Sequence, residues 1–360
     1  MVRLSLCLCL VALVALVTRT DSAACIVPSP TYPSTLLWTG PCTLGTTVTI
    51  TMSMMSPAAT LSVSISDITF SASAGIVVQG WSSFAAAPSS TVAITMASIT
   101  GTAFNNYLQL TGHFPSGTAI VVQSCDLRNS ATTPVGCPYV TPLCIMAALT
   151  GVGSSVRVTQ TTLSGTAATV AGMVLGSSSG SVSLSSSSLF FVENSISIQP
   201  SHTGYGMVMP NTMSLTATTL LVYGNSITIT PQAANVATMI HVAFLLAVTS
   251  LTNLFGFNAN TFAYGGAITI TGVAATGALS CQAVGFTNPV TMNDVDFEFK
   301  LNTMATTSMQ ISVSSQTVAG SYILHFGHTT SIISSRVMYT QNTLNCPTST
   351  NSATIGFNVA

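Results

Sequence analysis

The chain has 360 residues and almost no charge: 6 Lys or Arg and 7 Asp or Glu make up 4% of it and give a formal net charge of −1. In soluble globular chains about a quarter of the residues are usually charged. This scarcity excludes a polybasic nucleic-acid surface, an acidic disordered tail and a helical bundle held by ion pairs. We therefore expect no nucleic-acid partner.

Hydroxyl side chains take the place of charges. The sequence contains 48 Ser and 54 Thr beside 48% hydrophobic residues. Thr, Val and Ile suit a pleated strand, whereas stretches rich in Lys, Glu and Leu, which are typical of helices, are scarce. The composition therefore predicts an all-β fold, and β-rich folds of this length often form one unit.

The N-terminal segment 1–24 has the three-part layout of a secretory signal peptide. Arg3 precedes an apolar run at 4–17, and a polar stretch then leads to the small residues Ser22 and Ala24. We expect cleavage before Cys25 and a secreted or surface-displayed protein. The alternative is an N-terminal membrane anchor, but this run is shorter than the ~20 residues that a spanning helix needs.

Later in the chain the longest apolar stretch is Ile240–Val248, which is also too short to cross a membrane. We expect it to form a buried strand or a short packed helix. No stop-transfer segment or lipid-anchor signal follows it. The sequence therefore predicts that the chain encodes no membrane attachment of its own.

Seven cysteines remain after position 24, and an exported protein is expected to bridge some of them. Cys25 and Cys42 are candidates for one disulfide, and Cys137 and Cys144, which flank a Pro-containing loop, for another. Spacing alone does not decide the connectivity, and the odd number means that at least one cysteine is free or pairs outside this chain. The absence of a Cys-x-x-Cys pair argues against a zinc site.

The segment 181–200 repeats as the segment 212–231. Eight of the twenty positions are identical, and five more exchange Ser for Thr. The apolar residues of the first copy fall at 0, +2 and +7, namely Val182, Leu184 and Leu189, and a second alternating pair follows at Ile196 and Ile198. A step of two positions is strand alternation, so each copy predicts two sides of one coil.

The same 0, +2, +7 spacing recurs at intervals over most of the chain. The further copies are Leu61-Val63-Ile68, Val92-Ile94-Ile99, Ile120-Val122-Leu127, Val156-Val158-Leu163, Leu279-Cys281-Phe286 and Ile311-Val313-Val318. Stacked coils of short strands bury their inward residues against neighbouring coils. The pattern predicts one right-handed parallel β-helix over residues 25–360, with a series of β-sandwiches as the alternative.

The N-terminal segment, the rungs rich in Ser, Thr and Val, and the phrase GNSITI at 224–229 resemble the dispersed gene family surface proteins of trypanosomes. The resemblance implies a pectin-lyase-like β-helical ectodomain with an adhesin-like role. Members of that family are much longer and have membrane-spanning segments toward the C-terminus. The resemblance therefore implies a fragment or truncated copy without the C-terminal anchor, and it carries no catalytic residues over.

The densest group of charges is the segment 293–300, NDVDFEFK. On a strand, Asp294, Asp296, Glu298 and Lys300 would share one face. Three carboxylates in this pattern are what a calcium site or a polysaccharide-cleaving β-helix needs, so Asp294, Asp296 and Glu298 are the candidate metal ligands. The alternative is a solvated strand face whose charges discourage aggregation at the edge of a sheet.

Two histidines and the asparagines give weaker signals. His325 and His328 are spaced for a metal but have no partnered carboxylate, and we interpret them as surface or turn residues. Eight of the 17 Asn are followed directly by Ser or Thr, yet none has Ser or Thr at the second position after it, so no N-glycosylation acceptor exists. We expect Asn at corners of the coil, where the second residue after it points inward and is apolar.

These observations predict an adhesin-like structural protein, secreted or displayed at the cell surface, that binds host or matrix proteins or glycans. A carbohydrate-active β-helix enzyme, either a lyase or a hydrolase, and a non-functional truncated copy are the alternatives. We expect no cofactor and identify no catalytic residue.

Overall fold

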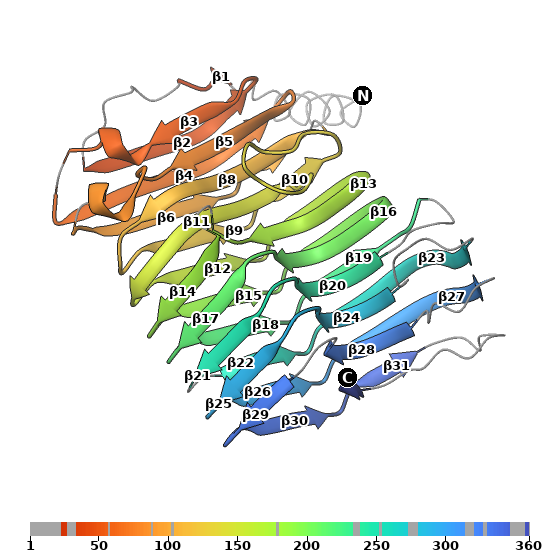
Figure 1. The fold of residues 1–360 in the computed structure, drawn as a ribbon. Helices are drawn as coiled ribbons and strands as arrows, with labels where there is room; N and C mark the ends of the chain where they lie inside the picture. The colour runs from red at the N-terminus through yellow and green to blue at the C-terminus, as the bar shows by residue number, and fades with distance from the viewer. Residues whose placement is uncertain are drawn as a thin grey trace, which may run out of the picture.

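The computed structural model describes residues 23–26, 34–56, 58–87, 89–101, 104–177, 180–232, 238–251, 254–272, 280–313, 320–326, 330–345 and 357–359. Nearly all of this part of the chain is β-strand, wound into stacked coils (Figure 1). The two short 3-10 helices are η1 (Met52–Met54) and η2 (Phe84–Ala86). Within the described ranges, no helix has the length and apolar character that a membrane span requires.

The strands stack in four columns, which we name the first, second, third and fourth faces. The first face contains β2 (Thr35–Leu44), β4 (Thr60–Phe70), β6 (Thr91–Ala97), β9 (Ala119–Gln123), β12 (Ser155–Thr159), β15 (Ser188–Val192), β18 (Thr219–Tyr223), β22 (Leu254–Asn258), β26 (Asp296–Lys300) and β30 (Arg336–Thr340). The second face continues β2 and β4 and contains β1 (Ala23–Ala24), β7 (Thr100–Gly101), β10 (Asp126–Asn129), β13 (Thr162–Leu175), β16 (Ser195–Met209), β19 (Ser226–Ile229), β23 (Thr261–Gly272), β27 (Thr303–Val313) and β31 (Thr343–Asn345).

The third face continues β13 and β16 and contains β3 (Val48–Thr51), β5 (Ala74–Gln79), β8 (Asn106–Phe114), β11 (Leu143–Val152), β20 (Thr238–Phe244), β24 (Ser280–Phe286), β28 (Gly320–Phe326) and β32 (Phe357–Val359). The fourth face begins with the end of β11 and contains β14 (Ser181–Ser185), β17 (Thr212–Thr216), β21 (Val248–Leu251), β25 (Val290–Asn293) and β29 (Thr330–Ile333). The ladders between these strands are parallel, so the prediction of an all-β parallel β-helix is confirmed and the β-sandwich alternative, which needs antiparallel sheets, is wrong.

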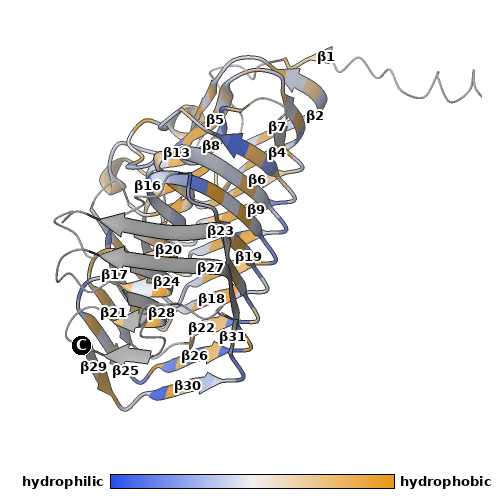
Figure 2. Ribbon diagram, turned by 90° about the vertical axis from the view of Figure 1, so that its right-hand side faces the viewer, coloured by the Kyte–Doolittle hydropathy of each residue, from blue (hydrophilic) through white to orange (hydrophobic). Residues whose placement is uncertain are grey.

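Corresponding residues of the two repeat copies are partners in the parallel ladders, so the offset between the copies sets the register of the sheet. Ser181 pairs with Thr212 on the fourth face, Ser188 with Thr219 on the first, and Ser195 with Ser226 on the second. Inward and outward residues alternate along these strands, as the burial of Val182 and Leu184 shows. Figure 2 shows the resulting alternation of apolar and polar positions.

The phase of the 0, +2, +7 pattern is different from the prediction. Val182 begins a copy on the fourth face, whereas Val156 begins one on the first. The copy that begins at Leu61 starts one inward position before the equivalent of Val156. The residue that stacks in line with Val156, through successive register partners, is Val63. In the copy that starts at 279, Phe286 lies on the third face. Any short strand followed by a corner produces this spacing, so the pattern marks corners of more than one kind.

Two corners of the coil are made by single residues in the left-handed conformation. Between the first and second faces these residues, with φ between 51° and 65°, are Asp67, Ser98, Ser124, Gln160, Glu193, Gly224, Ala259, Leu301 and Gln341. Between the fourth and first faces they are Gly153, Ser186, Ala217, Asp294 and Ser334. A left-handed conformation costs an L-residue other than Gly roughly 1–2 kcal/mol. The stacked ladders on both sides of each corner must therefore offset this cost.

The core lies inside the coil and is aromatic in its C-terminal half. Phe286 stacks on Phe244 in the preceding coil, with ring centroids 4.6 Å apart, and on Phe326 in the following coil, at 4.9 Å. On the first face, Phe297 stacks on Phe255 at 5.9 Å. All five side chains are buried. Equivalent positions in successive coils thus hold the same kind of side chain, as expected when each coil contacts only its neighbours.

A ladder of asparagines, all buried except the partly exposed Asn342, follows the corner between the first and second faces. Its members are Asn194, Asn225, Asn260, Asn302 and Asn342. In each coil the backbone N–H and the side-chain Nδ2 donate to the Oδ1 of the Asn in the next coil, at 2.9–3.0 Å.

The position of this ladder explains why three of its members are not glycosylation acceptors although Ser or Thr follows them. After Asn194, Asn225 and Asn260, the second following residue is the inward-facing Ile196, Ile227 or Phe262, and each of these is buried. The expectation that Asn occupies corners followed by inward apolar positions is confirmed for these members of the ladder.

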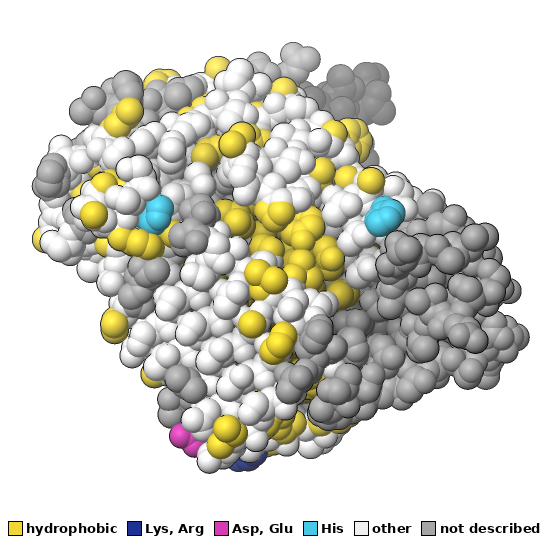
Figure 3. Space-filling view, viewed as in Figure 1, with side chains coloured by type: hydrophobic (Ala, Val, Ile, Leu, Met, Phe, Trp, Pro, Cys, Tyr) yellow, Lys and Arg dark blue, Asp and Glu magenta, His cyan; other side chains and the backbone are white. Residues whose placement is uncertain are grey.

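The third face is apolar on its outer side as well as its inner side. A separate cluster there includes Met146, Val174, Val208, Ile240 and Ala243. Figure 3 shows apolar side chains gathered in the middle of this face. Within the run at 240–248, the part 240–244 is continuous because β20 is buried on both sides. This part is a buried strand, 245–247 form the corner before β21 with Leu246 exposed, and the alternative of a short helix is wrong.

The structure links Cys25 to Cys42 and Cys137 to Cys144 by disulfides. Cys281 lies on β24, and Cys346 lies outside the described residues. Positions 1–22 of the expected signal peptide are also outside them. Ala23 and Ala24 form β1, which cleavage before Cys25 would remove.

Cys125 is a free thiol that is only 2% exposed, and burial raises its pKa to about 11. Because alkylation requires the thiolate, Cys125 is expected to stay unlabelled by iodoacetamide in the folded protein at pH 8. It should become labelled after unfolding in guanidinium, as measured by mass spectrometry of its peptide. Equal labelling of the folded and unfolded protein would contradict the buried position.

Candidate binding groove

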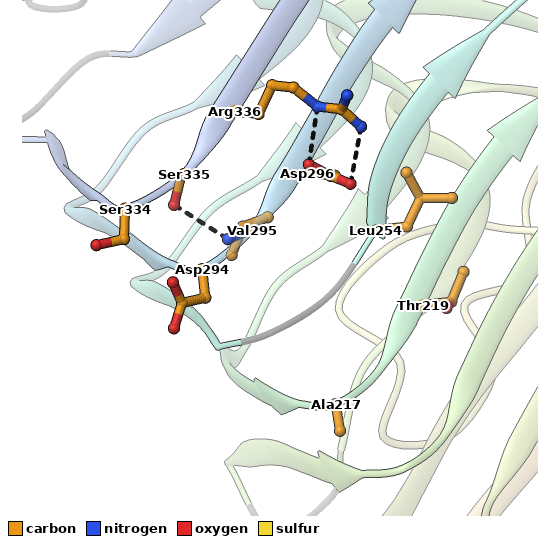
Figure 4. Close-up of a pocket in the computed structure, with 9 residues that line it drawn as sticks. All are labelled: Ala217, Thr219, Leu254, Asp294, Val295, Asp296, Ser334, Ser335 and Arg336. Carbon is orange, nitrogen blue, oxygen red and sulfur yellow. Dashed lines mark hydrogen bonds and ion pairs between the residues drawn. The ribbon is translucent and has the colours of Figure 1, made fainter.

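A groove of about 660 Å³ lies at the corner between the fourth and first faces, toward the C-terminal end of the β-helix. The residues that line it are Ala217, Thr219, Leu254, Asp294, Val295, Asp296, Ser334, Ser335 and Arg336 (Figure 4). Three of them, Ala217, Asp294 and Ser334, are left-handed corner residues. The stacking of coils therefore builds the groove, since it brings together residues that are far apart in the sequence.

The strongest polar contact in the groove joins two adjacent strands. Asp296 on β26 and Arg336 on β30 are partners in the parallel register. The Nε and NH2 atoms of Arg336 donate to the two carboxylate oxygens of Asp296, each at 3.0 Å. These bonds raise the pKa of Arg336 above its ordinary value. Both side chains are about half exposed, so the pair is a surface ion pair that a ligand can reach.

Glu298, two positions further along β26, is also paired. Lys300 Nζ lies 2.8 Å from its Oε1, and Asn258 Nδ2 on β22 donates to its Oε2 at 2.9 Å. The hydrogen bond from Lys300 is the largest cause that lowers the pKa of the Glu298 carboxyl, although burial opposes it. Glu298 is therefore held as a carboxylate, and a carboxyl with a lowered pKa is a poor proton donor at neutral pH.

The structure brings only part of the predicted carboxylate group together. Asp296, Glu298 and Lys300 alternate with the buried Phe297 and Phe299 on β26, as predicted. Asp294 does not share their strand face, because it occupies the corner before β26 with φ 53°. Figure 4 shows its carboxylate pointing away from Asp296.

The candidate metal ligands do not converge. In the described part of the chain, no group of three or more His, Cys, Asp or Glu residues is placed to hold a metal ion. Asp296 and Glu298 each contact a basic side chain instead. His325 lies on β28 in register with Gly285, on the third face and away from β26, and His328 lies outside the described residues.

Beside the groove, the outer side of the first face has an apolar strip. We define this strip as Phe190, Val192, Leu221, Tyr223 and Leu254, which occupy outward positions of β15, β18 and β22. Tyr223 is 44% exposed, and the others are partly exposed. Leu221 leans over Gly256, where an added Cβ would come within 3.1 Å of it.

The strip was not among the sites predicted from the sequence. The signal was present, since these residues alternate with the inward Leu189, Phe191, Leu220 and Val222. Where inward and outward positions of a strand are both apolar, the outer side of the strand is apolar as well as the side that faces the core. Arg157 on β12 lies on the N-terminal side of the strip, and the ion pairs of β26 and β30 lie on its C-terminal side.

The fold places the chain among all-β parallel β-helix proteins, and the groove with its strip gives this helix one differentiated face. No family model, curated protein or solved structure matches the chain.

Proposed function

We propose that this protein is an adhesin-like structural protein, secreted or displayed at the cell surface, that binds host or matrix proteins or glycans along its first face. The observation that carries the proposal is the groove with its adjoining apolar strip, which combines exposed apolar area with ion pairs that a ligand can reach. Interfaces typically have such an apolar centre with a polar rim. Fold alone does not define a function, so the proposal rests on this surface.

Export is supported by two independent features. The segment 1–24 has the signal-peptide layout, and the two disulfides suit an oxidising compartment. The resemblance to the dispersed gene family surface proteins of trypanosomes belongs to the same proposal. It suggests display at a cell surface and contact with a host.

A carbohydrate-active enzyme is the second candidate, and Asp294 favours it. Its carboxylate lines the same groove as Asp296, and no hydrogen bond or ion pair is found for this carboxylate within the described ranges. Sugar hydrolysis needs a proton-donating carboxyl as well as a carboxylate. Because Asp296 and Glu298 are both paired with basic groups, we favour binding. Activity on pectin-like polymers that is lost in D294A and D296A would favour the enzyme instead.

Adhesion is tested with the full chain produced in a secretory host. The wild-type protein is expected to bind cells or a matrix-coated surface saturably. The double variant L221S/Y223S should lower the apparent affinity at least tenfold, because a few anchors, Tyr prominent among them, supply most interface energy and the Leu221 change removes apolar area beside Tyr223. The matched control is V135S/V152S, which removes two exposed apolar residues away from the first face, Val135 in the turn between β10 and β11 and Val152 at the end of β11 on the fourth face.

The result that would overturn the proposal is an intact, folded protein that shows no saturable binding, which is what the non-functional copy predicts. Binding that L221S/Y223S leaves unchanged would show that the first face is not the binding surface. Circular dichroism and thermal unfolding of each variant establish that it is folded.

A further inference from the structure

A second and smaller hollow lies on the outer side of the second face, toward the N-terminal end of the β-helix. Its volume is about 240 Å³. It is lined by Phe104, Arg128, Asn129, Ser130, Ser164, Gly165, Thr166, Ser197 and Gln199. It shares no residue with the groove on the first face. At this size it is below the usual range for drug-sized ligands and far below a protein interface, so it suits one small ring.

Arg128 supplies the hollow with a cation that is free to bind an anion. It is exposed on β10, and neither of the two ion pairs found among the described residues involves it. Asp126, on the same side of the strand, is likewise absent from both of these ion pairs. An exposed guanidinium without a carboxylate retains all of its donors, and its planar fork matches carboxylate and sulfate oxygens.

Phe104 supplies an aromatic surface beside this cation. Its side chain is 72% exposed, yet its backbone is held in place. The backbone N–H of Ser130 donates to the Phe104 carbonyl at 2.9 Å, and the Ser130 hydroxyl donates to the same oxygen at 3.2 Å. Asn105, the next residue, forms a bridge with Asn129 at the end of β10. Phe104 is therefore anchored directly to the strand that carries Arg128.

The floor of the hollow consists of neutral polar groups in rows. Arg128, Ser164 and Ser197 are register partners in three successive coils, and Thr166 pairs with Gln199 in the next row. Coils lie ~4.8 Å apart, so the first row places the hydroxyl groups of Ser164 and Ser197 at successive steps of this size beside Arg128. Hydroxyls and an amide both donate and accept hydrogen bonds, which matches the hydroxyl groups of a sugar.

From this combination we infer that the hollow binds an acidic sugar unit. Phe104 stacks on the apolar face of the ring, Arg128 pairs with its carboxylate or sulfate, and Ser164, Ser197 and Gln199 bind its hydroxyl groups. The inference rests on the proposed function, since it gives one chemical class to the host or matrix ligands. It adds a site that is separate from the first face.

The experiment measures binding of three tetrasaccharides to the full chain by calorimetry. Hyaluronan tetrasaccharide carries carboxylates only, keratan sulfate tetrasaccharide carries sulfates only, and chitotetraose is neutral. At least one acidic tetrasaccharide is expected to bind at least tenfold more tightly than chitotetraose, and the difference should shrink as salt screens the charges. The acidic probe that binds identifies the anionic group.

Variants locate the binding. R128Q should lower the affinity for the acidic probe at least tenfold, and F104A should also weaken it. R157Q is the matched control, because Arg157 is an exposed arginine on the first face that is likewise absent from the two ion pairs. It should leave the affinity unchanged. Both residues replaced in the hollow are exposed, so the variants are expected to fold, and thermal unfolding checks this.

The inference is overturned if no probe binds, if the neutral probe binds as tightly as the acidic ones, or if R128Q binds like the wild type. If adhesion that depends on Leu221 and Tyr223 persists without sugar binding, only this inference fails. If acidic sugars bind through Arg128 while adhesion is absent, the hollow stands and the proposal for the first face fails.

Discussion

The variant F286A is expected to lower the free energy of unfolding by about 3–5 kcal/mol, the usual cost of truncating a fully buried Phe. Phe286 is fully buried and stacks between Phe244 and Phe326 of the neighbouring coils. Its loss removes apolar contacts on both sides and leaves a cavity that rigid ladders cannot close. Denaturant unfolding followed by circular dichroism measures the change.

Two controls accompany this variant. F286L keeps most of the side-chain volume and should cost clearly less, because the cavity is smaller. F104A removes an exposed Phe and should change stability by less than about 0.5 kcal/mol. Equal costs for F286A and F104A would contradict the aromatic core. A changed m-value in F286A would indicate that the coils unfold in separate steps.

The variant N260A is expected to cost about 2–5 kcal/mol, because it breaks the asparagine ladder at its centre and leaves buried polar groups unsatisfied. Asn260 accepts from the backbone N–H and Nδ2 of Asn225 and donates to the carbonyl of Val222 and to Oδ1 of Asn302. Alanine leaves the Asn225 N–H and the Val222 carbonyl buried without their partners. Each such group costs about 1–3 kcal/mol.

The matched control is N258A, which removes an asparagine of the same coil from the outer side. Asn258 donates to Glu298, and a surface contact of this kind is worth less than about 1 kcal/mol. Hydrogen exchange should show the damage of N260A in β19, β23 and the adjoining corners first, since each coil is stabilised by its neighbours. Equal stability of N260A and N258A would mean that the ladder contributes nothing net.

The sequence was sufficient to predict the type of fold because the information is local and repeated. Alternation within a strand, a corner residue and the next strand recur at a spacing that can be read along the chain, and the repeat at 181–231 contains the register directly. The placement of asparagines at corners, two positions before an inward apolar residue, followed from the same alternation. The corner to which each copy belongs did not follow, because different corners produce the same spacing.

The binding surfaces were less predictable because their residues meet only when the coils stack. The local pattern grouped Asp294 with Asp296 and Glu298, whereas Asp294 is itself a corner residue in the left-handed conformation and therefore does not share the strand face. The Asp296–Arg336 pair joins two different coils, and the small hollow on the second face joins Phe104 to Gln199. Long-range pairs such as these depend on the length of each coil, which varies along this chain.

The sequence by itself therefore determined the all-β class, the stacked coils and the inward residues, since hydrophobic periodicity is a property of each short segment. Only the tertiary structure decided the four faces, the pairing of the few charges and the location of the groove and the hollow. The physical reason is that parallel stacking places outward residues about 4.8 Å from partners one coil away, whatever their separation in sequence. The register between stacked coils therefore determines which of the few charged residues contact one another and which side chains line each surface.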